Sequence, residues 1–327
     1  MGTRYVIYGA GAIGATIGGY LFLGGYDVCM IARGAHLDAL QSTGLTLKTP
    51  NASHNLSIPS VGNPREAEVG SDDVVLMTMK SHHTIDALAA LEASAPPDIS
   101  VVCAQNGVAN EPLALRWFAN VYAMAVNMPA THIQPGVVEA SGTPVAGVLD
   151  VGRYPSGVDR VATELANALT QSSIRSEALA DVMRYKYAKL RVNTVNALDA
   201  ACGPSARHSE LAKQSRAEAL AVFAAAGIDV ASQDEVDARR GELRSAPIDG
   251  SQRSGSSSWQ SLHRGAGSIE TDYLSGEIVL LGRLHGVPTP VNQALRKLSN
   301  DMAREGLPPE SYSLDEVEAL VDRLRGS

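Results

Sequence analysis

The chain has 327 residues, of which 45% are hydrophobic and 19% are charged, and its formal net charge is −8 at pH 7. This length favours two domains, because a single hydrophobic core seldom extends beyond about 250–300 residues. The acidic balance, without any basic run, argues against nucleic acid as a partner, since binding to phosphates depends on clustered Lys and Arg.

The N-terminal segment predicts a dinucleotide-binding site. Residues 4–8 have the composition of a β-strand, a G-x-G-x-x-G motif follows at once, and residues compatible with a helix continue over 12–23. The motif consists of Gly9, Ala10, Gly11, Ala12, Ile13 and Gly14. Gly9 permits a tight turn, Gly11 permits close approach of a pyrophosphate, and Gly14 permits close packing of helix on strand. The alternative is a flexible turn, which the flanking strand and helix disfavour, so we expect phosphates at the helix N-terminus.

The residue after the second predicted strand bears on the choice of cofactor. This strand covers residues 26–32, and Arg33 stands where NAD-specific enzymes have an Asp or Glu that binds the ribose 2′-hydroxyl. A guanidinium gives that hydroxyl no acceptor but pairs well with a 2′-phosphate. Arg33 therefore predicts NADPH; the alternative is a solvated surface arginine.

Strand and helix patterns alternate through the first half of the chain. We expect helices over residues 36–42 and 84–95, and strands over 44–48, 54–61, 73–79, 100–104 and 121–126. The first two of these strands suggest a hairpin, and the continuous apolar run over 73–79 is typical of a parallel strand buried on both faces. The alternation predicts an α/β fold with a doubly wound parallel sheet of the Rossmann type, with extra edge strands within 137–152.

The second half of the chain has helical periodicity. Apolar stripes predict helices over residues 161–170, 178–200, 208–226, 233–244, 270–285 and 289–305. Residues 245–258 are rich in Ser and Gly and predict a mobile loop. We therefore expect an NADP-binding Rossmann domain over residues 1–175 and an all-helical domain for substrate binding and dimerisation over residues 176–327, with a homodimer as the expected assembly.

The spacing of the cysteines and the N-terminal segment indicate the cellular compartment of the protein. Cys29, Cys103 and Cys202 are widely spaced and form no C-x-x-C or metal-ligand pattern, which favours buried thiols in a reducing compartment. The apolar N-terminal stretch has no basic leader and contains the glycine motif, so it predicts neither a signal peptide nor a membrane span. We expect a cytoplasmic protein.

Polar residues that follow strands or share a helix face are the candidates for chemistry. Lys80 follows the strand over 73–79, and Gln105-Asn106-Gly107 follows the strand over 100–104, although such residues also commonly begin ordinary loops. Lys189, Asn193 and Asn196 are spaced i, i+4, i+7, which would place them on one face of a mostly apolar helix. A solvated helix face is the alternative, and periodicity alone does not choose between Lys189 and Lys186.

With these motifs in this order, the sequence resembles the ketopantoate reductases, also called 2-dehydropantoate 2-reductases, over nearly its full length. The similarity lies in the glycine motif, Ala32-Arg33-Gly34, Lys80, Gln105-Asn106-Gly107, Lys189-x-x-x-Asn193, and Ser258 followed twelve residues later by Glu270. The resemblance implies a Rossmann domain joined to an all-helical domain, and NADPH-dependent reduction of a 2-keto acid to a 2-hydroxy acid. The expected reaction is reduction of ketopantoate to pantoate in pantothenate and coenzyme A biosynthesis.

The resemblance also implies a role for individual residues. Lys189 is the expected proton donor to the substrate oxygen, which decides between it and Lys186. The residues expected to bind substrate are Asn106, Asn193, Asn196 and Ser258. The residues expected to bind the cofactor are Gly9, Ala10, Gly11, Ala12, Ile13, Gly14, Arg33, Lys80, Asn106 and Glu270, and no metal is expected. An ammonium group there would stabilise the charge that develops on the ketone oxygen and would supply the proton.

Three departures from the family pattern affect the substrate side. Asn196 comes three residues after Asn193 rather than four, Gly255 replaces an asparagine, and Trp259 replaces a smaller aliphatic residue. They leave two alternatives open beside ketopantoate reduction. One is a reductase for another bulky 2-keto acid or an imine on the same fold, and the other is a non-catalytic NADP-sensing protein, against which Lys189 argues.

Overall fold

The computed structural model describes residues 2–251, 255–265 and 267–326. It divides into two compact units. Unit 1 comprises Met1–Lys186 with Gln233–Arg253, and unit 2 comprises Tyr187–Ser232 with Ser254–Ser327. This division differs from the predicted boundary near residue 175, because it falls within a helix and returns a later segment to unit 1.

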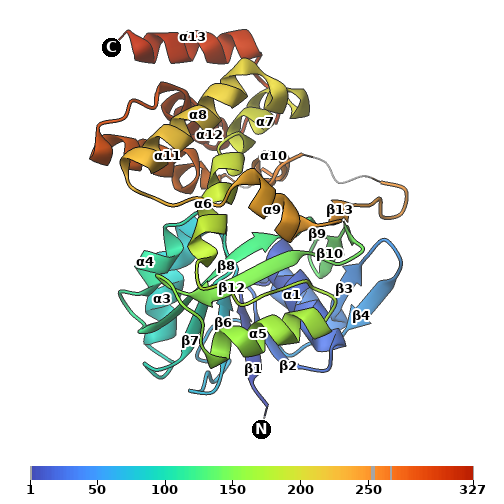
Figure 1. Cartoon of the computed structure of the whole chain (residues 1–327). Helices are drawn as coiled ribbons and strands as arrows, with labels where there is room; N and C mark the ends of the chain where they lie inside the picture. Colours follow the sequence, from blue (N-terminus) through green and yellow to red (C-terminus); the bar gives the residue numbers. More distant parts are fainter. Residues whose placement is uncertain (1, 252–254, 266, 327) are drawn as a thin grey trace. The chain divides into compact units, whose positions relative to one another are not determined.

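Unit 1 is built on a seven-stranded sheet with the strand order β12-β8-β7-β6-β1-β2-β5 (Figure 1). Its strands are β1 (Arg4–Tyr8), β2 (Asp27–Ile31), β5 (Ser60–Val61), β6 (Val74–Met77), β7 (Ser100–Cys103), β8 (Asn120–Asn127) and β12 (Val148–Arg153). All neighbours pair in parallel except β12, which is antiparallel to β8 at the edge. The order from β5 to β8 is that of a Rossmann sheet, which confirms the predicted doubly wound α/β fold.

Successive side chains along the strands point to opposite faces of this sheet, and apolar residues are buried on both faces. On β1, Tyr5 and Ile7 join one core with α1 (Ala12–Leu23) and α5 (Arg160–Gln171), whereas Val6 and Tyr8 join a second core. The helices of the second core are α3 (Thr84–Glu92) and α4 (Asn110–Ala114). Because parallel strands are covered on both faces, these runs read as continuously apolar in the sequence.

A second sheet corrects two predictions. Its order is β4-β3-β10-β9, from β3 (Leu45–Lys48), β4 (Ser53–Leu56), β9 (Ala130–Gln134) and β10 (Val137–Ala140). The predicted hairpin is confirmed, but residues 54–61 are not one strand. The chain leaves this sheet after Leu56, passes through Pro59, which has no N–H to donate, and joins the main sheet as β5. Within 137–152, only β12 lies at the edge of the main sheet; β10 pairs with β3 instead, because Leu45, Leu47 and Val138 pack on the core around α1.

Residues 233–253 belong to unit 1, although they were predicted as part of the helical domain. They contain α9 (Gln233–Arg240) and β13 (Arg244–Ser245), which pairs with β11 (Gly142–Thr143). Arg239 on α9 donates through Nε to the buried carboxylate of Asp150 on β12 (3.0 Å), and Arg184 pairs with Glu235 (2.8 Å). Helical periodicity predicts a helix at α9, but it does not predict which residues pair with the charged side chains of that helix. The predicted loop over 245–258 includes residues 252–254, which lie outside the described part of the chain.

The regular structure that is described in unit 2 is helical. Its helices are the second half of α6 (Val182–Asn193), with α7 (Asn196–Cys202), α8 (Glu210–Ala225), α10 (Ser257–His263), α11 (Ser275–His285), α12 (Pro290–Glu305) and α13 (Leu314–Arg325). The helical character agrees with prediction, but α13 was missed. A capping box between Ser313 and Glu316 begins α13, and this S-x-x-E pattern was the signal in the sequence.

Candidate functional site

The glycine motif, which forms the loop after β1 and the first turn of α1, has two glycines that packing of the chain requires and one that it does not. Gly9 has a φ of +100°, and a Cβ there would lie 2.7 Å from the backbone nitrogen of Met79. A Cβ on Gly14 would overlap the hydroxyl of Thr78 and lie 2.5 Å from the carbonyl oxygen of Gly9. At Gly11 the nearest atom would be 4.0 Å away, so packing of the chain gives no reason for a glycine there.

Two helices begin near this loop without a side-chain cap. Gly11 is the N-cap of α1, and Arg33 is the N-cap of α2 (Gly34–Thr43); neither side chain caps its helix, and neither first turn contains an acidic residue. The first backbone N–H groups of a helix have no intrahelical acceptor, and the helix dipole favours an anion there. Arg33 is exposed and follows β2, so its positive charge adds to this preference for an anion.

Hydrogen bonds hold together the segments that follow β6 and β7. The side chain of Gln105 donates to the carbonyl of Met79 (2.9 Å) and to the hydroxyl of Thr84 (2.8 Å). Asn110 donates to the backbone carbonyl of Asn106 (3.2 Å) and to the hydroxyl of Ser81 (3.1 Å). The structure therefore brings the Lys80 and Asn106 segments together, as parallel strands predict. Of the two linking residues, Gln105 was part of the polar segment predicted from the sequence, whereas Asn110 was not singled out, since a polar residue in a loop gives no sign of its partner.

Lys186 is part of a buried structural cluster. Its ammonium lies 2.5 Å from Glu111, with side-chain exposures of 3% and 0%, and donates to the carbonyl of Gln105 (2.9 Å). Burial raises the pKa of Glu111, and the charge of Lys186 offsets that effect in part. The contacts of Lys186 are thus with unit 1, whereas Lys189, one turn later on α6, belongs to unit 2.

The predicted stripe of Lys189, Asn193 and Asn196 on one helix is wrong at Asn196. Helix α6 ends at Asn193, and Asn196 begins α7 after a turn at Thr194 and Val195. The carbonyl of Thr194 accepts from the hydroxyl of Ser275 (3.1 Å), a long-range contact at the break that periodicity does not reveal. The side-chain oxygen of Asn196 accepts from Arg207 (2.6 Å).

Ser258 lies in the first turn of α10, whose position in unit 2 is fixed by a buried acid. The carboxylate of Asp199 accepts from the backbone N–H of Ser256 (2.8 Å), and the hydroxyl of Ser256 caps α10 at Trp259 (3.2 Å). Glu270 does not begin the long helix that was predicted; it begins a short 3₁₀ turn, Glu270–Tyr273, ahead of α11.

Two of the departures from the family pattern pack against each other. Gly255 has a φ of +56°, and a Cβ there would lie 2.5 Å from the ring of Trp259. The indole N–H of Trp259 donates to Glu310 (3.0 Å), and its ring stacks on that of His263 at 4.8 Å. The loss of a side chain at 255 and the gain of a ring at 259 are therefore one packing change.

Two further kinds of site were sought among the described residues. In residues 2–251, 255–265 and 267–326, no group of three or more His, Cys, Asp or Glu side chains could hold a metal ion. Over the same part of the chain, no helix has the length and apolar character needed to cross a membrane.

Comparison with known proteins agrees with the fold and the motifs. The family model for ketopantoate reductase PanE/ApbA matches residues 5–156, and the model for the C-terminal part of that family matches residues 181–303. A 2-dehydropantoate 2-reductase from Archaeoglobus fulgidus is 30% identical over 304 residues, covering 90% of this chain and 96% of the relative.

Solved structures give the same result. A ketopantoate reductase of the PanE/ApbA family from Ralstonia eutropha superposes with a TM-score of 0.78 at 27% identity, covering 93% of this chain and 99% of its own. A D-mandelate dehydrogenase, solved with NADH and anilino(oxo)acetate, shares the fold with a TM-score of 0.77 at 20% identity, covering 99% and 100% of the two chains. The chain belongs to the ketopantoate reductase family.

Proposed function

We propose that this protein reduces 2-dehydropantoate to pantoate with NADPH, as a step of pantothenate and coenzyme A biosynthesis. The observation that carries the proposal is Gly11, which begins α1 and which packing of the chain does not require to be glycine. A ligand that must approach the backbone closely explains a glycine at that position, and a pyrophosphate on the uncapped N-terminus of α1 is such a ligand. Family membership and the name of the Archaeoglobus fulgidus relative supply the substrate.

Arg33 supports NADPH over NADH. Its side chain is exposed, caps no helix and follows β2, where the 2′-substituent of a dinucleotide would be bound. Because the similar D-mandelate dehydrogenase fold was solved with NADH, the fold alone does not decide the cofactor. We expect Arg33→Ala to weaken NADPH binding by about 1.5–3 kcal/mol, the contribution of a charged hydrogen bond, and to leave NADH nearly unchanged. Titration with each nucleotide measures this, and an equal loss for both would contradict the role.

The chemistry assigned to this chain is proton transfer and orientation. A bound NADPH supplies the hydride. Lys189 is the proposed proton donor, because its ammonium can stabilise the developing alkoxide and then protonate it. Asn193 and Ser258 are proposed to bind the keto acid, Asn106 to contact both ligands, and Lys80 and Glu270 to bind the cofactor. Asn196 is the weakest member of the proposed set, since Arg207 already donates to its side-chain oxygen.

The test is oxidation of NADPH with a panel of keto acids. The panel contains ketopantoate, a smaller branched 2-keto acid and an aromatic 2-keto acid, and the highest kcat/KM is expected for ketopantoate. Lys189→Ala should lower kcat by about 10²–10⁴ with little change in NADPH affinity, as expected for loss of a positioned acid. Preference for the aromatic acid would favour the alternative reductase. NADPH binding without turnover of any member would favour a nucleotide sensor.

The alternative substrates lose their main support in the structure. They were suggested by Gly255 and Trp259, but these residues pack on each other, and Trp259 also contacts Glu310 and His263 within unit 2. A compensated packing change of this kind needs no change of substrate to explain it. Ketopantoate therefore remains the proposed substrate.

A homodimer and a cytoplasmic location complete the proposal. Leu220 on α8 and Leu280 and Leu284 on α11 are exposed, and α8 and α11 pack on each other within unit 2. Exposed leucines on neighbouring helices suit a contact between two copies of the chain. Light scattering coupled to gel filtration tests the dimer, and a monomeric mass at micromolar concentration would contradict it.

A further inference from the structure

One histidine contacts the carbonyl side of the glycine-rich loop. His36 lies in the first turn of α2, and its Nε2 is 2.6 Å from the carbonyl oxygen of Ala10. Its other ring nitrogen, Nδ1, accepts the backbone N–H of Gly136 (2.9 Å) in the turn between β9 and β10. Since Nδ1 is occupied as an acceptor, the proton of the neutral ring lies on Nε2, which therefore donates to Ala10.

The surroundings of His36 favour this neutral form. Burial lowers the pKa of His36, and the hydrogen bond to Ala10 offsets that only in part. His132 on β9 faces the ring edge-on, with centroids 4.6 Å apart and its Nε2 at 3.2 Å from Nδ1. A second proton on Nδ1 would place a donor against the N–H of Gly136, so the backbone itself selects the tautomer.

The backbone N–H groups of the same loop are held by strand β2. The backbone N–H groups of Gly9 and Ala10 both donate to the carbonyl of Ile31, at 3.0 and 3.2 Å. His36 supplies the matching contact on the carbonyl side, so the loop is held by β2 on one side and by α2 on the other. A loop that contains two glycines, Gly9 and Gly11, would otherwise lose considerable backbone entropy when it is ordered by a ligand.

We propose that His36 is a positioning residue that fixes the Gly9–Gly11 loop, which precedes α1, relative to the N-terminus of α2. This inference rests on the proposed dinucleotide site. His36 lies three residues after Arg33, the N-cap residue of α2, so the contact links the proposed pyrophosphate loop to the helix that begins after Arg33. A loop that is already ordered binds nucleotide more tightly, because less ordering is required on binding.

Three substitutions separate the two hydrogen bonds of the ring. His36→Gln keeps an N–H donor near the position of Nε2 and loses the acceptor for Gly136. His36→Asn keeps an acceptor near the position of Nδ1 but is too short to reach Ala10. His36→Phe keeps a ring and loses both bonds. Gln41→Ala is the matched control, since Gln41 lies on the same helix and donates to the carbonyl of Ser60 (2.9 Å) instead.

Nucleotide affinity is the first readout. His36→Phe and His36→Asn should each raise the Kd for NADPH and NADH about tenfold, or about 1.4 kcal/mol, with kcat unchanged at saturating nucleotide. His36→Gln and Gln41→Ala should stay within about threefold of the wild type. The ratio of the two Kd values should not move, in contrast to Arg33→Ala, because both nucleotides share the pyrophosphate. Wild-type affinity in His36→Phe would overturn the proposal.

Amide hydrogen exchange of the protein without nucleotide is the second readout. Exchange across residues 9–14 should accelerate in His36→Phe and His36→Asn but not in His36→Gln. Peptides from β7, which His36 does not contact, are the internal control, and equal acceleration there would show general destabilisation and overturn the positioning role. If exchange changes as expected but the wild type binds neither nucleotide, the proposed function fails while the anchoring of the loop stands.

Discussion

The two edges of the seven-stranded sheet in unit 1 differ in how their polar groups are satisfied. At the amino ends of the strands, side chains hydrogen-bond one another, and Asp159 caps α5 by accepting the N–H of Ala162 (3.1 Å). At the carboxyl ends, α1 and α2 begin at Gly11 and Arg33 without side-chain caps. A capped N-terminus has its donors satisfied, whereas an uncapped one is suited to an anion. The difference supports the proposed binding of an anion at the carboxyl ends of the strands, whereas the polar groups at the amino ends are satisfied within the chain.

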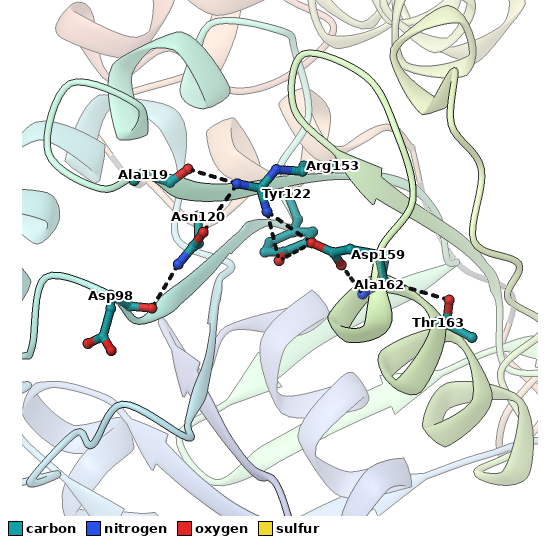
Figure 2. A network of polar contacts seen from close by, with 8 residues as sticks. All are labelled: Asp98, Ala119, Asn120, Tyr122, Arg153, Asp159, Ala162 and Thr163. Atoms are coloured by element: carbon teal, nitrogen blue, oxygen red, sulfur yellow. Dashed lines mark hydrogen bonds and ion pairs between the residues drawn. The ribbon is translucent and has the colours of Figure 1, made fainter.

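Figure 2 shows the network at the amino edge. Tyr122 on β8 donates to Asp159 (2.8 Å), and Arg153 on β12 donates both to Asp159 (2.9 Å) and to Asn120 (3.2 Å). Asn120 in turn donates to the backbone carbonyl of Asp98 (2.9 Å). These bonds join the antiparallel edge strand to its neighbour and to the start of α5. No ligand is needed to complete any of them.

The carboxyl edge also contains polar groups that are satisfied within the chain, among them Gln105 and Asn110. The buried pair of Lys186 and Glu111 is another, and breaking it should have the largest effect on stability. Lys186→Met leaves the fully buried carboxylate of Glu111 without its cation, which typically costs about 3–5 kcal/mol. Urea denaturation measures the loss. The matched control is the double variant Lys186→Met with Glu111→Leu, which removes both charges and should recover most of the stability. Equal losses in the single and double variants would contradict this account.

A smaller effect on stability should distinguish Gly14 from Gly11 in the glycine motif. Gly14→Ala forces a Cβ against the carbonyl of Gly9 and should reduce stability by about 1–3 kcal/mol, the usual cost of overpacking. In Gly11→Ala the added Cβ would lie no nearer than 4.0 Å to another atom, so the melting temperature should be unchanged. The affinity for NADPH should fall at least tenfold. Thermal melting and nucleotide titration of both variants make the comparison. A stable Gly11→Ala protein with wild-type affinity would remove the observation on which the proposed function depends.

The sequence predicts the strand, turn and helix of the glycine motif better than the rest of the molecule, for a local reason. The strand, turn and helix around Gly9–Gly14 are adjacent in sequence, so the spacing of the glycines alone predicts how the three elements are arranged. The break between α6 and α7 is accompanied by long-range hydrogen bonds from Ser215 and Ser275 to Thr194, and the return of α9 to unit 1 depends on the pairing of Arg239 with Asp150. Such partners are far apart in sequence, and periodicity does not encode them.

The same limit applies to the candidate site. Lys80 and Asn106 could be selected because each follows an apolar strand, and their segments do meet through Gln105 and Asn110. Lys186 could not be distinguished from Lys189 by periodicity, since Glu111 lies 75 residues away from Lys186 in the sequence. Burial of that partner, rather than any property of α6, identifies Lys186 as structural.

The smallest predicted effect belongs to the amino edge and depends on pH. Burial acts to raise the pKa of Asp159, but hydrogen bonds from Ala162, Tyr122 and Arg153 outweigh it and hold the pKa below its ordinary value. The folded state therefore favours the charged form, so this stabilisation is fully present above the unfolded pKa of about 3.9 and is lost as pH falls through the lower folded value. Asp159→Asn keeps a capping side chain and removes the charge, and it should destabilise the protein by about 1 kcal/mol at neutral pH.

Urea denaturation at pH 7 and at about pH 3 tests this dependence, with the difference between wild type and Asp159→Asn expected to shrink at the lower pH. Glu164→Gln is the control, because Glu164 pairs with Arg160 on the exposed surface of α5, where such a pair contributes little at either pH. NADPH affinity should be unchanged in both variants, since the network completes itself without a ligand. If Asp159→Asn instead lowered the affinity for NADPH at least tenfold, as is expected for Gly11→Ala, the two edges would be coupled. The division into a structural edge and a binding edge would then be wrong.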